Sequence, residues 1–258
     1  AEDYKKDKAK YNENYTGTTK LHVMSDKIDE VYNKQAINIE NENLKENQFI
    51  ELDAYDGTSS GLARYSNNKL QYVESNKNVY SIRPKNKEQV FAFDLLMDPE
   101  IELITLTGQS GTGKTLLSLA AGMAQVDNQN IYDRFLVCRP AVSVGNELGF
   151  APGTIEEKLK HWMKPIYDNF GILCQGDAEE IIMEMKEYKK LQIESLQHIR
   201  GRSIPNQFFL IDEAQNLSPS QIKTIITRAA EDTKIVITGD IEQIDDPYLA
   251  HDCNALSH

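Results

Sequence analysis

The chain of 258 residues contains little cysteine, no long apolar run and no excess of positive charge. Its three cysteines, Cys138, Cys174 and Cys253, are widely separated and form no C-x-x-C pair, so neither a zinc site nor a disulfide framework is indicated. No apolar run reaches the ~18 residues that a membrane-spanning helix requires, and no secretory signal opens the chain. These absences predict a protein of a reducing cytoplasm with no membrane partner.

The shortage of positive charge restricts the partners that we expect. Lysine and arginine together number 28 against 40 aspartates and glutamates, which gives a net charge of −12. Charge alone therefore does not provide tight, nonspecific binding to nucleic acid. A local basic groove stays compatible with this composition, because ligand contacts depend on the local potential.

Three regions differ in composition along the chain. Residues 1–46 are polar and rich in charge, and we predict a linker with a short strand near Leu21–Met24 and a helix near Ser25–Tyr32. Residues 47–83 contain strand-like runs separated by glycine, serine and asparagine turn signals, which predict a small β subdomain. The runs are Phe49–Leu52, Leu62–Tyr65, Leu70–Val73 and Val79–Ile82. Over residues 84–258 strands and helices alternate, which is typical of a parallel sheet flanked by helices.

The α/β region has readable strands and helix starts. The expected strands cover residues 101–107, 134–138, 207–212 and 234–239. The run Phe208–Ile211 is apolar at every position, as expected for a strand that is covered on both faces. Thr154–Glu157 and Ser218–Gln221 each fit a capping box, in which two side chains satisfy backbone N–H groups at a helix N-terminus.

The most specific motif is the stretch Gly108-Gln-Ser-Gly-Thr-Gly-Lys-Thr115, which fits the P-loop pattern G-x-x-x-x-G-K-[ST] between a strand and a helix. Its glycines let backbone N–H groups turn inward around a phosphate. Lys114 would reach the β- and γ-phosphates, and the Thr115 hydroxyl would ligate Mg²⁺. We therefore predict that the chain binds a nucleoside triphosphate. The predicted nucleotide-binding residues of this loop are Gly108, Gln109, Ser110, Gly111, Thr112, Gly113, Lys114 and Thr115.

Two further strands end in polar residues. Asp212 and Glu213 have the Walker B form, in which the aspartate reaches Mg²⁺ and the glutamate is the candidate general base. Thr238 or Gln243, from the next strand, is a candidate to sense the γ-phosphate, and Asp240 is a candidate to assist Mg²⁺ or to link the site to a substrate. Because ligands of open α/β sheets bind at the carboxyl ends of the strands, we expect these segments beside the P-loop. The predicted catalytic residues are Lys114, Asp212, Glu213 and Gln243.

The D-E-x-Q box at 212–215 and the G-D-x-x-Q box at 239–243 resemble those that flank the nucleotide in superfamily-one helicases. More narrowly, the order of motifs over roughly residues 85–250 resembles the PhoH family of P-loop ATPases. The resemblance implies a RecA-like α/β fold, binding of ATP and Mg²⁺, and action on RNA. The matching stretches are Thr107–Thr115, Arg139–Val142, Gly145–Phe150, Pro152-Gly153, Arg200–Arg202, Asp212–Asn216 and Thr238–Asp240 through Gln243–Asp245.

The resemblance also implies roles for five residues outside these catalytic positions. Gln89 would bond the adenine edge and favour ATP over GTP, although a surface glutamine on a helix is an equally open reading. Arg139 is similar to a helicase residue that couples nucleotide to nucleic acid. Arg200 and Arg202 are candidates to hold a phosphate of RNA or of ATP from a neighbouring subunit, and Arg228 is another candidate finger in trans.

The region before residue 84 resembles the tail and linker that join a PIN nuclease to a PhoH domain in fused proteins. The resemblance rests on Ala1–Tyr4, Tyr15–Gly17 and Asn47–Ile50. It implies that residues 1–46 are the remnant of a PIN-domain tail and that the full-length form is coupled to a PIN ribonuclease. The family usually continues with a further strand and an arginine-bearing segment. Either that segment is missing from the sequence given, or ATP hydrolysis relies on another arginine.

The predicted function is thus an RNA-dependent ATPase or helicase with single-stranded RNA as its partner. A single RecA-like domain offers no second lobe to close the site, so we expect a homo-oligomer, for which a hexameric ring is one form. Two alternatives stay open. One is a small-molecule kinase built on the same P-loop, and the other is a nucleotide-gated assembly or RNA-binding module with little turnover.

Overall fold

The computed structural model describes residues 16–34, 36–39, 43–140, 163–176, 178–199, 203–245, 249 and 254–257. These residues divide into two compact units. The first, here called the N-terminal unit, contains the described residues up to 77 together with 83–94. The second, here called the P-loop unit, contains residues 78–82 and the described residues from 95 onward.

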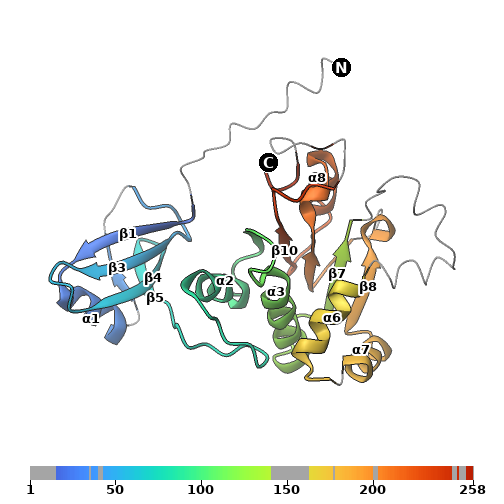
Figure 1. The fold of residues 1–258 in the computed structure, drawn as a ribbon, viewed down its shortest axis with the longest axis horizontal. Helices are drawn as coiled ribbons and strands as arrows, with labels where there is room; N and C mark the ends of the chain where they lie inside the picture. Colours follow the sequence, from blue (N-terminus) through green and yellow to red (C-terminus); the bar gives the residue numbers. More distant parts are fainter. Residues whose placement is uncertain are drawn as a thin grey trace, which may run out of the picture. The chain divides into compact units, whose positions relative to one another are not determined.

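The N-terminal unit is built on a five-stranded sheet with the order β1-β3-β4-β5-β2 (Figure 1). β1 runs parallel to β3, and the other neighbouring strands are antiparallel. Helix α1 follows β1, and helix α2 begins in this unit. The bounds of these elements are Thr18–Val23 for β1, Ser25–Lys34 for α1, Ala36–Asn38 for β2, Phe49–Ala54 for β3, Ser60–Ser66 for β4, Lys69–Tyr72 for β5 and Lys87–Met97 for α2.

The core of the N-terminal unit lies between α1 and one face of this sheet. Ile28 and Val31 of α1 are buried against Ile50, Leu52 and neighbouring apolar side chains of the sheet. Alternation along β3 sends the intervening side chains to the other face, where Phe49 stacks on Phe91 of α2 with ring centroids 4.3 Å apart.

The predicted boundary at residue 46 does not coincide with an edge of this sheet. β1, α1 and β2 all lie within the span expected as a linker, and β1 and β2 pair with β3 and β5. Their charged residues occupy the exposed positions of amphipathic elements, so composition alone resembles that of a linker. Residues 79–82, expected as a strand, form instead a tight turn in which Tyr80 and Ser81 have φ of 45° and 67°.

The P-loop unit is built on a five-stranded parallel sheet with the order β6-β10-β9-β7-β8. The strands are Leu103–Thr107 for β6, Arg134–Arg139 for β7, Leu191–Ser195 for β8, Gln207–Ile211 for β9 and Lys234–Gly239 for β10. The four strands expected from the sequence are thus confirmed to within two residues at each end. β8 was not predicted. It is an edge strand of five residues, and its apolar residues alternate with polar ones over too short a run to indicate a strand.

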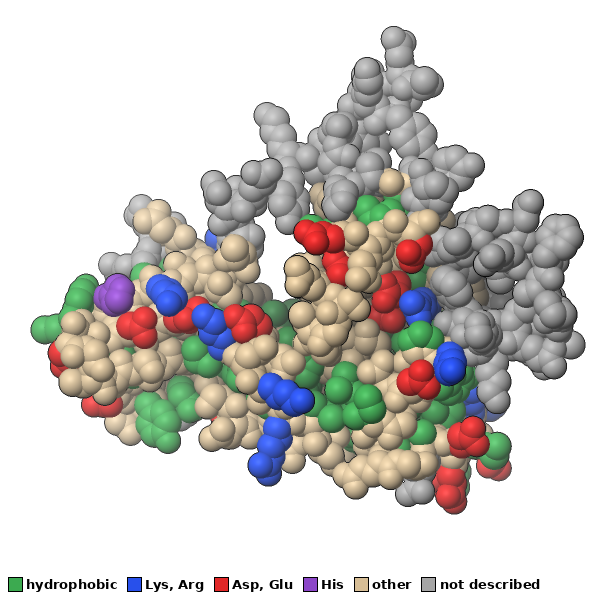
Figure 2. All heavy atoms as spheres, viewed as in Figure 1, with side chains coloured by type: hydrophobic (Ala, Val, Ile, Leu, Met, Phe, Trp, Pro, Cys, Tyr) green, Lys and Arg blue, Asp and Glu red, His purple; other side chains and the backbone are tan. Residues whose placement is uncertain are grey.

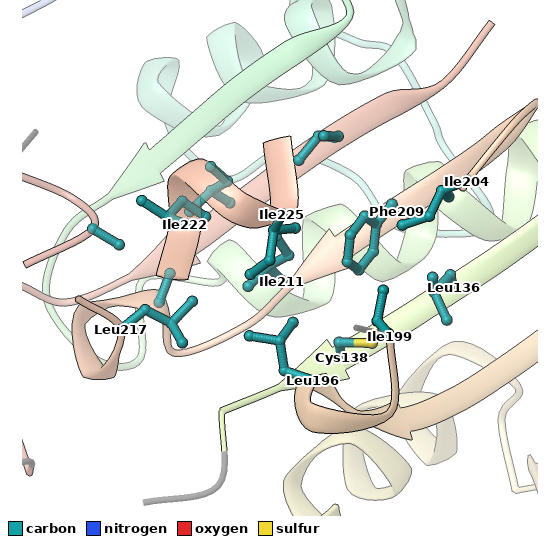
Figure 3. Close-up of a cluster of buried hydrophobic side chains, with 14 residues drawn as sticks. Leu136, Cys138, Leu196, Ile199, Ile204, Phe209, Ile211, Leu217, Ile222 and Ile225 are labelled. Atoms are coloured by element: carbon teal, nitrogen blue, oxygen red, sulfur yellow. The ribbon is translucent and has the colours of Figure 1, made fainter. Parts of the chain in front are cut away.

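Helices cover both faces of the parallel sheet. α3 and α6 lie together against one face (Figure 1), where the Phe135 ring packs on Gly122 of α3 and on Phe170 of α6. On the other face, Ile222 and Ile225 of α8 point toward Phe209 and neighbouring side chains of the sheet (Figure 3). The helices of this unit are Lys114–Met123 for α3, extended by a π-helical turn at Ala124–Asn128, Lys164–Leu173 for α6, Ala178–Glu187 for α7 and Pro219–Ile226 for α8.

The predicted fold class is confirmed. The protein has a RecA-like P-loop fold with a parallel sheet flanked by helices, and a separate N-terminal β unit. The capping box at Ser218 and Gln221 opens α8 as expected, whereas Thr154–Glu157 lie outside the described residues. Among the helices that the structure describes, none combines the length and apolar character needed to cross a membrane.

Candidate active site

The P-loop connects the carboxyl end of β6 to the first turn of α3. Gly111 and Gly113 have φ of 80° and 93°, a left-handed conformation that glycine adopts without steric cost. The ammonium group of Lys114 donates hydrogen bonds to the carbonyl oxygens of Gly108 and Gln109 at 2.6 and 2.9 Å. The loop is therefore wound around its own lysine, and the N-terminus of α3 adds positive electrostatic potential at the same place.

Asp212 is the point at which three chain segments meet. Its Oδ1 accepts hydrogen bonds from the hydroxyl groups of Thr115 and Thr238, each at 2.7 Å. Its backbone N–H donates to the carbonyl of Cys138 at 2.9 Å, which fixes the residue at the end of β9 beside β7. Asp212 is only 3% exposed, so this carboxylate is held by a small set of defined partners.

Glu213 follows Asp212 in a left-handed backbone conformation, with φ 57° and ψ 42°. This conformation costs a residue with a side chain on the order of 1–3 kcal/mol, and such strain concentrates at functional sites. The turn directs the Glu213 side chain toward two partners. Its Oε1 lies 3.7 Å from Nη2 of Arg139, and its Oε2 accepts a hydrogen bond from Nε2 of Gln215.

Gln215 joins the ends of β9 and β10. Its side chain is fully buried, and its Nε2 also donates to the carbonyl of Gln243 at 3.0 Å, while its Oε1 accepts from the N–H of Asp240 at 3.1 Å. A Cβ atom on Gly239 would collide with this Oε1, so any larger residue would have to displace the Gln215 amide and disturb its hydrogen bonds. The close approach of the Gln215 side chain to the backbone at Gly239 explains why a glycine ends β10.

Asp240 connects this junction to the P-loop. Its Oδ2 accepts a hydrogen bond from the N–H of Ser110 at 2.9 Å, and its Oδ1 accepts from the N–H of Glu242 at 3.0 Å. The carboxylate therefore bonds the loop backbone, and its role toward Mg²⁺ or a substrate remains a prediction. A further pair, Asn216 and Asp245, closes the same junction, with the Asp245 N–H donating to Asn216 Oδ1 at 2.9 Å.

The structure brings together most of the predicted site residues that belong to the P-loop unit. Gln89 belongs to the N-terminal unit, where its Oε1 accepts from the Lys85 N–H at 2.7 Å, so its role toward adenine remains a prediction. The Gln243 side chain is exposed, although its backbone is held by Gln215. Arg200 and Arg202 lie outside the described residues.

Arg228 lies in the turn after α8 rather than on the helix itself. Its carbonyl accepts from the N–H of Ile204, which precedes β9, so its backbone lies at the amino edge of the sheet. Asp212 lies eight positions after Ile204 in the chain, and eight steps of extended chain span about 26 Å. Within one chain the structure therefore does not bring Arg228 to the P-loop, and a role in trans remains a prediction.

The oxygen atoms at Asp212 suit a magnesium ion. Mg²⁺ prefers oxygen ligands and is usually held by one or two carboxylates, waters and the phosphates of its nucleotide. Thr115 and Asp212 provide a hydroxyl and a carboxylate within 2.7 Å of each other. The described residues contain no group of three or more His, Cys, Asp or Glu side chains suited to a metal that needs a full protein cage.

Cys138 lies beside this site but is not a nucleophile candidate. Burial raises the pKa of its thiol well above the ordinary value of 9.0, and the nearby Glu194 acts in the same direction. The thiol therefore stays protonated within the apolar cluster that α8 covers (Figure 3).

The sequence did not reveal the roles of Gln215, Asn216 and Asp245 in this junction. A signal was present, because the motifs D-E-A-Q-N and G-D-I-E-Q-I-D each follow a strand, and both strands end at one edge of the sheet. What the sequence lacked was the order of the strands. β9 and β10 are direct neighbours, which places the two motifs in contact.

Comparison with known proteins agrees with the motif order. The family described as PhoH-like protein matches residues 81–258. The chain is 42% identical over 272 residues to Protein PhoH2 of Bacillus subtilis, covering 100% of this chain and 60% of the relative. It is 33% identical over 234 residues to Protein PhoH2 of Thermobispora bispora, covering 90% of this chain and 52% of the relative. The chain thus spans little more than half the length of these two relatives.

A solved structure is also similar in outline. The SWI2/SNF2 ATPase core of Sulfolobus solfataricus in complex with dsDNA matches 68% of this chain and 36% of that chain, with a TM-score of 0.41 and 18% identity. The family match covers the whole P-loop unit beyond residue 95, including every residue of the P-loop and of the junction at Gln215. The chain belongs to the PhoH family of P-loop ATPase-fold proteins.

Proposed function

We propose that this chain binds ATP with Mg²⁺ and hydrolyses it, and that single-stranded RNA stimulates the reaction. The observation that carries the proposal is the meeting of the Thr115 and Thr238 hydroxyls on one carboxylate oxygen of Asp212. The first turn of α3, the end of β9 and strand β10 contribute to this point, and the P-loop that leads into α3 has left-handed glycines. Such a convergence of oxygen ligands beside a glycine-rich loop suits a magnesium-bound triphosphate.

In this proposal each residue has a defined task. The amides of Gly108–Gly113 and the Lys114 ammonium hold the phosphates, and Thr115 with Asp212 holds Mg²⁺. The metal ion neutralises charge on the phosphates when it is bound. Glu213 accepts a proton from the attacking water, and Gln243 orients the γ-phosphate end of the site.

RNA as the partner is supported by local features rather than by total charge. Figure 2 shows lysine and arginine side chains interspersed with aspartates and glutamates on the face in view, with no broad patch of one sign. Binding of a phosphodiester backbone would therefore depend on single arginines such as Arg139, which lies at the carboxyl edge of the sheet. We propose homo-oligomerisation, for instance as a hexameric ring, as the means by which Arg228 of one subunit reaches ATP in another.

Steady-state ATP hydrolysis, measured with and without oligo(rU), tests the proposal. We expect turnover that rises with RNA and falls by about 10²- to 10⁴-fold in Glu213→Gln. Glu231→Gln, which removes the same charge from an exposed turn, serves as the matched control and should behave as the unmodified chain. Equal turnover in Glu213→Gln and the control would refute the assignment of the base.

One observation supports a second function, that of a nucleotide-gated RNA-binding module with little turnover. Both carboxylate oxygens of Glu213 face a partner in this structure. A general base must present an oxygen to water, so a permanently engaged Glu213 would slow hydrolysis. ATP binding without turnover, in the presence and absence of RNA, would favour this function.

The relatives are longer than this chain, and the proposal for the whole protein includes a PIN ribonuclease joined to the PhoH region. It rests on the resemblance of residues 1–50 to such a linker. Mg²⁺-dependent cleavage of RNA by a longer form, absent from residues 1–258 alone, is the expected result. Cleavage of RNA by residues 1–258 alone would contradict the assignment of the ribonuclease activity to a PIN region outside these residues.

A further inference from the structure

In the N-terminal unit, strand β5 ends before its neighbour β4 does. The last paired residues are Ala63 of β4 and Tyr72 of β5, and one further hydrogen bond joins the Val73 N–H to the Leu62 carbonyl at 3.0 Å. Beyond that bond the chain turns away from the sheet. Within the described part of the unit, the first residues of β4, Ser60–Leu62, therefore have β3 on one side and no strand on the other.

The hydrogen bonds of β4 show which backbone groups lie on this open edge. The Ser59 carbonyl accepts from the Ala54 N–H on the β3 side, whereas the Leu62 carbonyl accepts from Val73 on the β5 side. Successive residues of an antiparallel strand direct their N–H and C=O groups alternately to the two sides. Ser60 therefore directs both of its backbone groups, and Leu62 its N–H, toward the open edge. Among residues that the structure describes, these three groups have no hydrogen-bond partner.

A hollow of about 360 Å³, here called the β4 groove, lies along this edge. A second hollow, of about 540 Å³, shares Tyr32, Tyr72 and Ser75 with it. The two tyrosine rings meet edge to face with centroids 5.1 Å apart, and Tyr32 is 59% exposed. Unpaired N–H and C=O groups beside an exposed aromatic ring suit an extended peptide, which adds to a sheet as a short strand.

The charges around the two hollows indicate the chemistry of the peptide. The charged residues that line them are Glu51, Asp53, Glu74, Asp94 and Lys77. Glu51 lies 2.7 Å from Lys87, and the carboxylate of Asp94 forms an ion pair within the sheet. Asp53 and Glu74 form no ion pair with any described residue. Their charge disfavours a phosphodiester and favours lysine or arginine, whose cations also bind to the face of a tyrosine ring.

Going beyond the proposed function, we propose that the β4 groove binds a short extended peptide of a partner protein that carries lysine or arginine at successive positions. The peptide backbone bonds Ser60 and Leu62, in the place that β5 leaves open. Leu52 is buried in the core beneath α1, so its neighbour Asp53 points to the opposite face of the sheet. Because side chains alternate along a strand, one basic side chain of the peptide reaches the tyrosine rings beside α1 and the next reaches Asp53.

Fluorescence anisotropy with labelled pentalysine as the probe tests the proposal on residues 1–258. We expect saturable binding, and none of pentaglutamate. Pentalysine that is N-methylated at its second and fourth residues loses two backbone donors and should bind about fivefold or more weakly. The amides of Ser60 and Leu62 should exchange more slowly with the unmethylated probe bound. Equal affinity for both forms of pentalysine, or unchanged exchange at these two amides, overturns strand addition.

A pair of double variants separates the groove from general attraction to an acidic chain. Asp53→Asn with Glu74→Gln should weaken pentalysine binding by about three- to tenfold. Asp29→Asn with Glu88→Gln removes two exposed carboxylates of the same unit that do not line the groove, and should bind as the unmodified chain does. An equal loss of affinity in the two double variants overturns the proposal.

The tyrosine contact and the rival occupants are tested with the same probe. Tyr32→Ala should weaken binding by about two- to fivefold, whereas Tyr55→Ala, at a 72% exposed tyrosine outside the groove, should not change it. Competition by oligo(rU) would assign the groove to nucleic acid, and dissociation of an oligomer by pentalysine would assign it to a second copy of the chain. Either result overturns the proposal. Because every residue of the groove lies in the N-terminal unit, none of these outcomes depends on ATP turnover.

Discussion

The two units use their buried polar side chains in different ways. In the N-terminal unit, Arg64 lies inside the sheet, forms an ion pair with Asp94 at 3.0 Å and donates hydrogen bonds to Asn47 and Gln71. These partners belong to the same unit and surround one side chain. In the P-loop unit, five buried polar side chains gather instead at one edge of the sheet, whereas others, such as Gln125 and Lys234, bond backbone carbonyls elsewhere in the unit. The five are Asp212, Gln215, Asn216, Thr238 and Asp240.

The direction of the strands explains this difference. Most neighbours in the N-terminal sheet are antiparallel, so the carboxyl ends of its strands are distributed over both edges. In the P-loop unit the five strands are parallel, and the carboxyl ends of β6, β7, β9 and β10 meet at one edge. Polar residues that end parallel strands converge, whereas a polar residue within an antiparallel sheet must be satisfied by its local neighbours.

The largest expected effect separates function from stability at the parallel edge. Asp212→Asn keeps an oxygen that can accept from Thr115 and Thr238 but loses the charge that holds Mg²⁺. We expect ATP turnover to fall by about 10²-fold or more, while the free energy of unfolding stays the same or rises, because a buried charge is removed. Turnover and urea unfolding are measured together, with the exposed Asp133→Asn as the control. A large loss of stability would place Asp212 with Arg64 as a residue of the core.

The converse change tests the N-terminal unit. Arg64→Ala leaves Asp94 without its ion-pair partner and should lower the stability of this unit by about 3 kcal/mol. Amide hydrogen exchange of β3, β4 and β5 reports that loss, since exchange follows local opening. Lys69→Ala removes an exposed cation from the same sheet and should leave the exchange unchanged. Protected amides in Arg64→Ala would contradict the role given to this network.

Two glycines give a matched pair of smaller effects. A Cβ atom on Gly239 would collide with Gln215 Oε1 and would lie 2.7 Å from Leu256 Cδ1, so Gly239→Ala should cost about 1–3 kcal/mol and lower ATP turnover. In the N-terminal unit, a Cβ on Gly61 would lie 3.3 Å from Ile28 Cγ2, and Gly61→Ala should cost less than about 1 kcal/mol. Thermal unfolding of both variants measures the contrast. Equal costs would show that the β9–β10 junction is not unusually tight.

Alkaline pH should weaken the P-loop unit. Burial raises the pKa of Tyr132 from its ordinary value of 10.0 to about 12, with Asp232 acting in the same direction. A raised pKa favours the neutral folded form, so this contribution to stability is full below pH 10 and is lost as the pH rises through about 12. Between pH 9 and 11 the urea midpoint should fall less in Tyr132→Phe than in the unmodified chain. Part of the fall should remain in the variant, because the pKa of Tyr80 is also raised to about 12. Identical falls in both proteins would exclude Tyr132 as a cause.

The smallest expected effect concerns acid pH and the N-terminal unit. A hydrogen bond from Lys87 lowers the pKa of Glu51 below its ordinary value of 4.5. A lowered pKa contributes stability that is full above pH 4.5 and is lost as the pH falls through the folded-state value. Glu51→Gln should flatten the acid side of the stability profile slightly, as followed by exchange of the β3 amides. A profile that keeps its full acid slope would show that this surface pair contributes nothing measurable.

Several parts of the fold were predictable because they depend on local sequence. The P-loop needs glycines at two left-handed positions and a lysine and threonine at fixed spacing, and these residues stand in one stretch. The apolar strand before Asp212 and the capping box at Ser218 are likewise local. A strand near Leu21–Met24 and a helix near Ser25–Tyr32 were also predicted, and β1 and α1 confirm them, but they were assigned to a linker because their apolar residues are few. Only the packing of α1 and β1 against β3 and β4 shows that these residues belong to a core.

The sequence by itself determined the P-loop, the Walker B strand, the parallel character of the second sheet and membership of the PhoH family. Each of these follows from short-range patterns of residue type. The tertiary structure decided which strands are neighbours, and so placed Gln215 against Gly239, Ser110 against Asp240, and Arg139 against Glu213. Those contacts join residues far apart in the chain, and their geometry depends on strand order and side-chain direction, which no local pattern encodes.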